Sequence, residues 1–477
     1  MTFTTTQILP TIGGWRLIDV TLLVGAAFLL SMTTLRWYST RRNIPPGPPP
    51  RFFGLNKAPS GTHPSKVFYM MQKQYGKYSE GRTLVVVLGT LKAATDLLEK
   101  KGSIYSSRPR SILADTVWRN ERSQHALWTT LEKLAIRMGI EASQGYRALQ
   151  SLESKILLKQ LLTDKDPRNY ASYFRRFAVS IVFCVAYGRR VDSLDDPAVI
   201  ANFKTDEWIR LIYSTPGRYI VESWPILLYL PRFMQWFRHE AEERRKEDTE
   251  LYMSLVSEVR KRIDLGVAAP STARRALEKQ SDFGLNDVET AFALSAPFAA
   301  GVGTTLSALN VFFLAMLHFP GVMHNAQQEI DDVVGSSRIP DFDYINSLPY
   351  IKAVILETLR WRPIAPIGVP HSVIQDDIYQ AGDDELFIPS GSTVYANIHS
   401  MSKDTEAFPS PDEFRPERYL EAESSSSNSP HTTFFFGFGR RICPGMHVAQ
   451  NSLYAVIVRY VWIYGHVEVA NEFIAID

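Results

Sequence analysis

Hydrophobic positions along the chain predict a protein built mainly of helices. Two long apolar runs, residues 287–317 and 446–464, each have the length and composition of one helix. Shorter stretches repeat apolar residues at helical spacing and predict one helix at 90–100, two within 149–191 and one at 351–361. Residues 84–88, Leu-Val-Val-Val-Leu, predict a short strand.

Three segments between these elements differ in polarity. Residues 238–250 are dense in charges of both signs, which is typical of a solvated helix face. Residues 224–230 lie in an aromatic, proline-interrupted stretch and carry no charge. They have two interpretations: part of the core, or a lid between two helices that enters a membrane and admits apolar substrates. The serine-rich residues 421–430 predict a surface loop.

The N-terminal apolar segment predicts a membrane anchor within residues 1–43. Residues 17–35 carry a single charge, Asp19, and are long enough to span a bilayer. Three arginines follow this segment and one precedes it, so the positive-inside rule predicts a cytosolic location for the rest of the chain. A cleaved signal peptide is the alternative, but it requires a shorter apolar core and a small-residue cleavage site, and neither is evident.

After the anchor, residues 44–51 predict a stiff hinge and residues 52–477 one large domain. The hinge contains Pro-Pro-Gly-Pro-Pro-Pro, which favours polyproline structure. The chain of 477 residues is 45% hydrophobic and 21% charged, with a net charge of +2. This is the composition of an ordinary globular protein, and the charge gives no support for a nucleic-acid partner.

The two cysteines have different expected roles. Cys184 lies in an apolar stretch and is predicted to be a core residue. Cys443 ends the segment Phe-Phe-Phe-Gly-Phe-Gly-Arg-Arg-Ile-Cys, residues 434–443, just before a predicted helix. No disulfide framework is therefore implied, which fits a reducing compartment.

The residues around Cys443 suit an iron porphyrin. A thiol at a helix N-terminus beside arginines is expected to form a thiolate. Nearby glycines allow the backbone to approach a flat, bulky group. The sulfur would bind the iron, a backbone N–H would donate to the sulfur, and Arg441 would meet a propionate. A buried structural cysteine on a glycine-rich turn is the alternative.

The spacing of this segment resembles the heme-binding loop of the cytochrome P450 family. Its pattern, Phe-x-x-Gly-x-Arg-x-Cys-x-Gly, is filled by Phe436, Gly439, Arg441, Cys443 and Gly445. The resemblance implies heme b with the Cys443 thiolate as axial ligand to the iron, and contacts from Phe436 and Arg441 to the cofactor.

Three further residues match places where the family holds heme propionates. Trp118 and Arg122 are four apart on a predicted helix, hence on one face, and match the family's Trp-x-x-x-Arg pair. A solvated charged helix is the alternative for this pair. His371, after Pro370, stands where the family has a second propionate ligand.

Two helices carry the remaining matches. Residues 300–305, Ala-Gly-Val-Gly-Thr-Thr, resemble the family's oxygen-activating segment, which makes Thr304 the catalytic threonine. Small residues there would allow a local helix opening, whereas a packing seam is the alternative. Glu357 and Arg360 share a helix face and, with Arg418, match the family's buried Glu–Arg–Arg triad.

The resemblance implies a mainly α fold with a small β-sheet subdomain, the cytochrome P450 fold with an N-terminal transmembrane helix. Its style is that of fungal microsomal members. The expected activity is monooxygenation: insertion of one oxygen atom from O2 into an apolar small molecule. A role in fungal secondary metabolism is expected, with a terpenoid, polyketide or indole-type substrate.

The same resemblance implies partners and a location. Because the chain shows no flavin or nicotinamide domain, electrons are expected from a separate NADPH-dependent P450 reductase. The expected location is the endoplasmic reticulum membrane, with one span and a cytosolic catalytic domain.

Three features depart from the family pattern. Gly303 stands where the family usually has an acid, the stretch between Ser107 and Trp118 is short, and the chain ends at Asp477, where the family continues into a hairpin. Pro297 is expected to kink the helix just upstream of Gly303. Two other functions therefore stay open: a heme-thiolate isomerase or dehydratase that needs no O2, and a non-catalytic heme protein.

Overall fold

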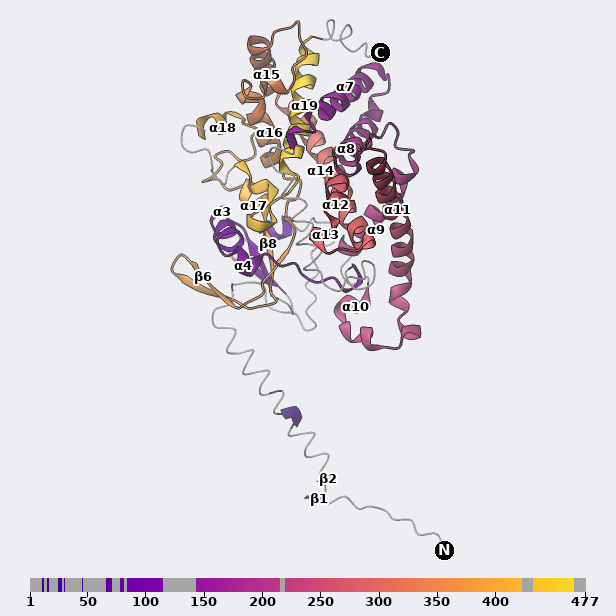
Figure 1. Cartoon of the computed structure of the whole chain (residues 1–477). Coiled ribbons are helices and arrows are strands. Elements are labelled where there is room, and N and C mark those ends of the chain that lie inside the picture. Colours follow the sequence, from indigo (N-terminus) through magenta and orange to yellow (C-terminus); the bar gives the residue numbers. More distant parts are fainter. Residues whose placement is uncertain are drawn as a thin grey trace.

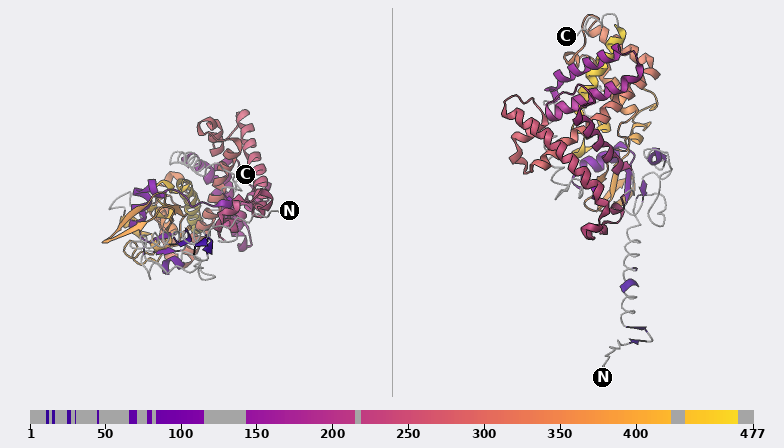
Figure 2. Two further views of the ribbon diagram at one scale, coloured as in Figure 1. Left: turned by 90° about the horizontal axis from the view of Figure 1, so that it is seen from below. Right: turned by 90° about the vertical axis from the view of Figure 1, so that its right-hand side faces the viewer.

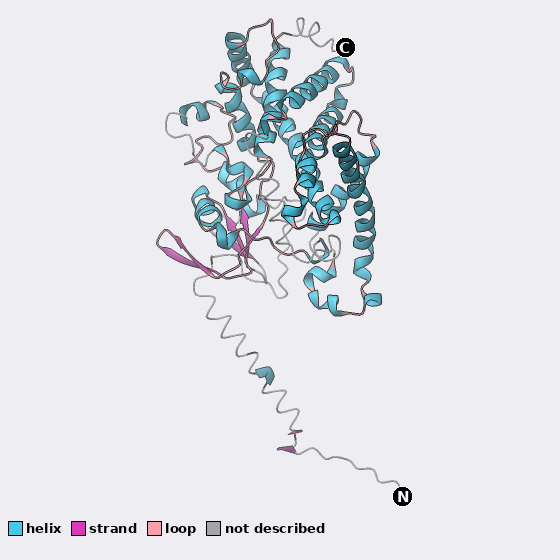
Figure 3. Cartoon of the chain, in the orientation of Figure 1, coloured by secondary structure: helices cyan, strands magenta, loops and turns pink. Residues whose placement is uncertain are grey.

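The computed structural model describes most of the chain beyond residue 83 (Figure 1). The described residues are 84–114, 143–214, 219–422 and 432–466, with the short stretches 11–12, 15–16, 25–27, 30, 45, 66–70 and 78–80 before them. Helices make up most of this part, and the strands of the folded body gather at one side (Figure 3). The predicted mainly α architecture with a small sheet is confirmed.

Long helices form the centre of the molecule. They are α7 (Arg147–Thr163), α8 (Tyr170–Tyr187), α14 (Asp287–His318), α15 (Pro320–Val333), α16 (Pro349–Trp361) and α19 (Met446–Gly465). α8 packs along α14, and α7 packs against α19. Leu157, Phe312, Val354 and Ile457, from four of these helices, are fully buried in one shared apolar core. The helices predicted from periodicity at these places are confirmed.

Helix α14 is the element on which the others pack. Its first turn is a capping box: the Asn286 side chain accepts from the Glu289 N–H, and the Glu289 carboxylate accepts from the Asn286 N–H. By length and composition it is the one membrane-crossing candidate within the described part of the chain. Its contacts with α8, α11 (His239–Asp264), α16 and α19 identify it as a helix of the protein core.

A second group of helices covers the other side of α8 and α14. It consists of α9 (Pro197–Ser214), α11, α12 (Thr272–Glu278) and α13 (Gln280–Phe283). Phe183, Val221, Phe298 and Val302 belong to the apolar cluster on this side. α11 buries an apolar stripe and exposes most of its charges, so the solvated face predicted at 238–250 is confirmed except at Asp248, which is fully buried and paired with Arg244.

The uncharged stretch 224–230 is mostly exposed and has no fully buried residue, so its interpretation as core is wrong. Leu227 and Leu228 pack against the second apolar cluster but are only half-buried. The stretch follows α10 (Ile220–Ser223) and lies in the first of three 3₁₀ turns, Pro225–Tyr229, Arg232–Met234 and Trp236–Arg238, at the lower right of the folded body in Figure 1. Trp224 is 60% exposed, Ile226 69% and Tyr229 89%. Short turns cannot bury all their side chains against α10 and α11, and the apolar ones remain on the surface. We call residues 224–236, which expose several large apolar side chains, the apolar loop.

A four-stranded sheet, ordered β3-β4-β8-β5, completes the fold. β4 (Val85–Leu88) is parallel to β8 (Thr393–Ala396), whereas β3 (Tyr78–Glu80) and β5 (His371–Ser372) are antiparallel to their neighbours. The strand predicted at 84–88 is therefore confirmed. A separate hairpin, β6 (Asp377–Ala381) and β7 (Asp384–Ile388), projects away from the helices of the second group (Figure 2, left).

Short elements connect the sheet to the helices. They are α3 (Leu91–Ala94), the π-helical turn Thr95–Lys100, α4 (Gly102–Tyr105), α17 (Ile398–Ser402) and α18 (Glu417–Ala422). The helix predicted at 90–100 is therefore present, but its second half is wound as a π turn. Cys184 is buried in α8, as predicted.

Several predictions fall mostly outside the described residues. Within residues 1–43 the structure describes 25–27 and Leu30, which are helical, and two paired short strands, β1 (Thr11–Ile12) and β2 (Trp15–Arg16). Of the hinge it describes only Pro45. Trp118 and Arg122 lie outside the described residues, as do most of the serine-rich segment and the chain beyond residue 466.

Candidate heme site

The loop before α19 is held in place by its own backbone and by two glycines. Two 3₁₀ turns, Phe434–Phe436 and Gly439–Arg441, lead to Cys443, whose N–H donates to the Phe436 carbonyl over 2.9 Å. Gly437 and Gly439 have positive φ angles of 90° and 56°. A Cβ on Gly439 would lie 2.2 Å from the carbonyl oxygen of Leu98, so the loop presses directly on the π turn.

The sulfur of Cys443 lies in an apolar, half-buried position. Burial raises the pKa of the Cys443 thiol, and a hydrogen bond from the Gly445 N–H lowers it only in part. The expectation that nearby arginines would make the thiolate is therefore wrong, because the Arg441 Nε donates elsewhere, to the Ser106 carbonyl at 2.7 Å. A metal ion bound to the sulfur supplies that stabilisation directly, because a coordinating thiol is deprotonated.

Three basic side chains from distant segments gather beside this loop, and we call them the basic cluster: Arg108, His371 and Arg441. The Arg108 Nη1 donates to the carbonyls of Val369 and Pro370, both at 2.7 Å. The His371 Nδ1 donates to the Tyr105 carbonyl at 2.8 Å. Burial, and then the charges of Arg108 and Arg441, lower the pKa of His371 to about 4.

This donor set fits heme. The sulfur of Cys443, with one backbone N–H directed to it, suits iron coordination. The charges that disfavour a proton on His371 would stabilise an anionic carboxylate placed among them, as heme propionates require. Phe436 is half-buried in the loop, with its ring centroid 5.2 Å from that of Phe435, and its carbonyl fixes Cys443.

The oxygen-activating segment of α14 is helical without interruption. The Thr304 hydroxyl donates to the Ala300 carbonyl at 2.7 Å, and α14 remains an α-helix across Pro297 and this segment. The predicted local opening is therefore absent in this structure. The hydroxyl instead bonds to the carbonyl one turn earlier in the same helix, a common partner for a threonine within a helix.

The two glycines of this segment have different roles. A Cβ on Gly301 would lie 2.7 Å from Cγ2 of Val182, so Gly301 is part of the α8–α14 packing seam. A Cβ on Gly303 would have no atom within 4 Å, and Ala300, Gly303 and Thr304 are all exposed. The packing-seam interpretation is therefore confirmed at Gly301, whereas the predicted opening is absent and Gly303 faces open space.

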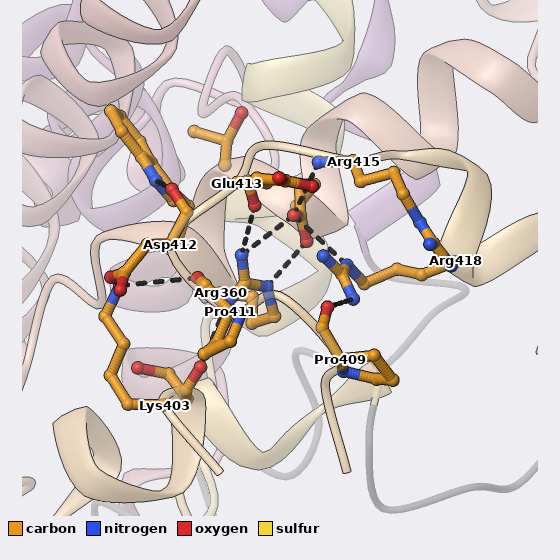
Figure 4. A network of polar contacts seen from close by, with 12 residues as sticks. Arg360, Lys403, Pro409, Pro411, Asp412, Glu413, Arg415 and Arg418 are labelled. Atoms are coloured by element: carbon orange, nitrogen blue, oxygen red, sulfur yellow. Dashed lines mark hydrogen bonds and ion pairs between the residues drawn. The ribbon is translucent and has the colours of Figure 1, made fainter. Parts of the chain in front are cut away.

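The Glu–Arg–Arg triad forms as predicted (Figure 4). Glu357 and Arg360 are fully buried and joined by two hydrogen bonds, of 2.7 and 2.8 Å. Arg418 Nε and the Arg415 N–H both donate to Oε1 of Glu357, at 3.2 and 2.8 Å. The remaining Arg360 donors reach the carbonyls of Ser402, Pro411 and Glu413. One carboxylate thus fixes the segment that leads toward the loop before α19, residues 434–445, which we call the heme loop.

The sequence pattern missed the residues that surround the basic cluster. Arg108, Tyr105 and Ser106 form no motif of their own, and they meet His371 and Arg441 only because β5 and the heme loop fold against α4. The role of Gly439 against Leu98 was also absent from the pattern. In the sequence, the signal for this site was the segment Ser-Ser-Arg-Pro-Arg, residues 106–110. Its role could not be predicted, because it depends on contacts with residues far along the chain.

Comparison with known proteins gives one consistent result. The family model described as Cytochrome P450 matches residues 45–461. Cytochrome P450 monooxygenase 58 of Postia placenta is 35% identical over 396 residues, which cover 80% of this chain and 73% of that protein. Cytochrome P450 monooxygenase claR of Ampulloclitocybe clavipes is 32% identical over 468 residues, covering 95% and 86%. Cytochrome P450 monooxygenase virE of Hypocrea virens is 32% identical over 441 residues, covering 89% and 79%.

These relatives confirm the family and the enzyme class that the motifs predicted, an oxidoreductase of the monooxygenase type. The match spans the sheet, the central helices and the heme loop. The chain therefore belongs to the cytochrome P450 family.

Proposed function

We propose that this protein is a membrane-anchored monooxygenase that inserts one oxygen atom from O2 into an apolar small molecule. It would use heme b bound through the Cys443 thiolate. The observation that carries the proposal is the meeting of the Cys443 loop with the basic cluster, which provides a sulfur ligand and sites for carboxylates in one place.

When bound, the heme supplies reductive activation of O2 and transfer of one oxygen atom, assisted by electron donation from the thiolate. Among this chain's residues, Cys443 would hold the iron, and the Gly445 N–H would orient the sulfur. Arg108, His371 and Arg441 would bind the propionates. Trp118 and Arg122 are proposed to assist them.

We propose Thr304 as the residue whose hydroxyl donates protons in the reaction. In this structure the Thr304 hydroxyl donates a hydrogen bond to the Ala300 carbonyl, with 2.7 Å between the two oxygens. Rotation about one side-chain bond would direct the hydroxyl proton elsewhere. Gly303 beside it carries no acid, so protons must reach Thr304 through water or through the substrate.

Membrane attachment is proposed from the N-terminal segment and from the apolar loop. Phe233 is 88% exposed and Trp236 64%, an unusual density of large apolar side chains for a surface in contact with water. We propose an anchor within 1–43, a hinge at 44–51 and a cytosolic domain at 52–477, on the endoplasmic reticulum membrane. The electron donor would be a separate NADPH-dependent P450 reductase.

The substrate class is proposed to be a fungal secondary metabolite of terpenoid, polyketide or indole type. Support comes from the fungal relatives, at 32–35% identity over most of the chain.

The test uses the full-length protein in membranes with a fungal P450 reductase and NADPH. The reduced, carbon-monoxide-bound protein should show the red-shifted Soret band of thiolate ligation, and Cys443→Ala should lack it. Incubation under ¹⁸O2 with a panel of the three substrate types should give a product carrying one labelled oxygen atom. A product formed without O2 would instead indicate an isomerase or dehydratase, and a wild-type protein without the Soret band would refute heme-thiolate ligation.

A further inference from the structure

A single carboxylate joins two parts of the chain, helix α10 and the segment that follows α4. Glu222 of α10 accepts a hydrogen bond from the Ser111 hydroxyl at 3.0 Å. It also accepts bonds from the backbone N–H groups of Ile112 and Leu113, both at 2.9 Å. Ile112 and Leu113 are buried, so these amides have no access to bulk water if the carboxylate is removed.

The bonded segment begins at the basic cluster. We call residues 105–114 the strap. Its first residues hold the cluster through their carbonyls: Tyr105 accepts from His371, Ser106 from Arg441, and Ser107 from the Ser372 N–H at 2.8 Å. The next residue, Arg108, belongs to the cluster itself. One end of the strap is therefore fixed at the proposed propionate site.

The other end of the strap lies against α14. Ile112 and Leu113 are 5% and 0% exposed and belong to the same apolar cluster as Phe298 and Val302 of α14. Val302 is two residues before Thr304. Residues two apart point to nearly opposite sides of a helix, so the strap packs against α14 on the side away from the exposed Thr304. A displacement of this end of the strap would therefore affect Thr304 through a shift of α14 itself.

Glu222 also connects the strap to the surface. Its helix α10 leads directly into the apolar loop, through bonds from the Trp224 N–H to the Ile220 carbonyl and from the Leu227 N–H to the Trp224 carbonyl. Val221, next to Glu222, is fully buried in the cluster that holds Leu113. Glu222 is thus the charged link between a loop that faces outward and a strap that reaches the basic cluster.

We propose that Glu222 is a positioning residue that latches the strap to α10 and so limits the rate at which bulky apolar ligands reach the heme. The inference deepens the proposed function and rests on it. Hydrogen bonds to a carboxylate are among the stronger ones in proteins, and three of them on one side chain hold both segments in one arrangement. Without them, the strap and the apolar loop separate more often.

The first measurement is hydrogen exchange of the strap in the full-length heme protein. Glu222→Ala should accelerate exchange at Ile112 and Leu113 about 2- to 10-fold, the factor expected for each lost hydrogen bond. Ser111→Ala removes one of the three bonds and should have a smaller effect, and it serves as the second variant if Glu222→Ala folds poorly. The matched control is Glu243→Ala, which removes an exposed glutamate of α11.

The second measurement is stopped-flow binding of two nitrogen ligands of heme iron, the small imidazole and the bulky clotrimazole. Glu222→Ala should raise both the association and the dissociation rate of clotrimazole about 2- to 10-fold, and leave imidazole rates within experimental error. Glu243→Ala should change neither.

Two results would overturn the latch. Unchanged exchange at the strap would mean that Glu222 does not hold it, and faster exchange with unchanged clotrimazole rates would make Glu222 a structural cap only. Failure of the proposed function is separate, because it would appear as a wild-type protein without the thiolate Soret band, whereas the exchange measurement needs no turnover.

Discussion

Gly439→Ala is the sharpest test of how the heme loop is held. Gly439 has a φ of 56°, and the added Cβ would lie 2.2 Å from the Leu98 carbonyl oxygen and 3.0 Å from the Glu99 Cα. Both contacts are with backbone, so no side chain can rotate away. Either the π turn Thr95–Lys100 or the loop must move.

The destabilisation expected for Gly439→Ala has two parts. An alanine in the left-handed region costs about 1–2 kcal/mol. Forcing an extra carbon into a packed contact typically adds about 1–3 kcal/mol. We therefore expect Gly439→Ala to destabilise the protein by about 2–5 kcal/mol.

A control variant separates the two parts. Gly284 has a similar φ of 63°, but a Cβ there would have no atom within 4 Å. Gly284→Ala should therefore carry only the conformational cost, about 1–2 kcal/mol.

The assay is urea unfolding of the three proteins, together with heme content per mole of protein. Because Cys443 lies four residues after Gly439, displacement of the loop should lower heme content in Gly439→Ala and leave it normal in Gly284→Ala. Equal destabilisation in the two variants, or full heme content in Gly439→Ala, would refute the argument that close backbone approach fixes this loop.

Glu357→Ala removes the carboxylate shared by Arg360 and Arg418, so two buried guanidinium groups lose their counter-charge. We expect destabilisation of about 3–5 kcal/mol, seen as protein without heme, whereas normal heme content with lost turnover would make Glu357 catalytic. Gly303→Asp has open space for its side chain and should raise the ratio of product to NADPH consumed, with less peroxide released. An unchanged ratio with intact heme would mean that Thr304 and water suffice. In heme-free protein, the pKa of His371 is about 4, below its ordinary value of 6.5, so the unfolded state binds more protons as pH falls below 6.5. Stability should then fall by up to about 3 kcal/mol between pH 6.5 and 4, and His371→Asn should flatten this part of the urea midpoint profile. A profile with the same slope in both proteins would contradict this assignment.

Local spacing determined the family and much of the fold. The residues from Phe436 to Gly445 act through positions a few residues apart, and such a pattern is visible without any structure. Helical periodicity likewise predicted α14 and α16, because the burial of one helix face requires apolar residues at fixed intervals. The Glu357–Arg360 pair was also local, and the family pattern supplied Arg418.

The tertiary structure decided what depends on contacts between distant segments. The same residue type has three roles at Gly301, Gly303 and Gly439, because one faces Val182, one faces open space and one faces the Leu98 carbonyl. The direction in which the pKa of Cys443 shifts could be derived only from the fold. Burial of the sulfur raises this pKa more than the hydrogen bond from the Gly445 N–H lowers it, and Arg441 donates to the Ser106 carbonyl instead. The exposure of residues 224–230 could not follow from their lack of charge, because an apolar segment is core only where other elements cover it. Composition and spacing thus determine which groups are present, and packing decides which atoms they meet.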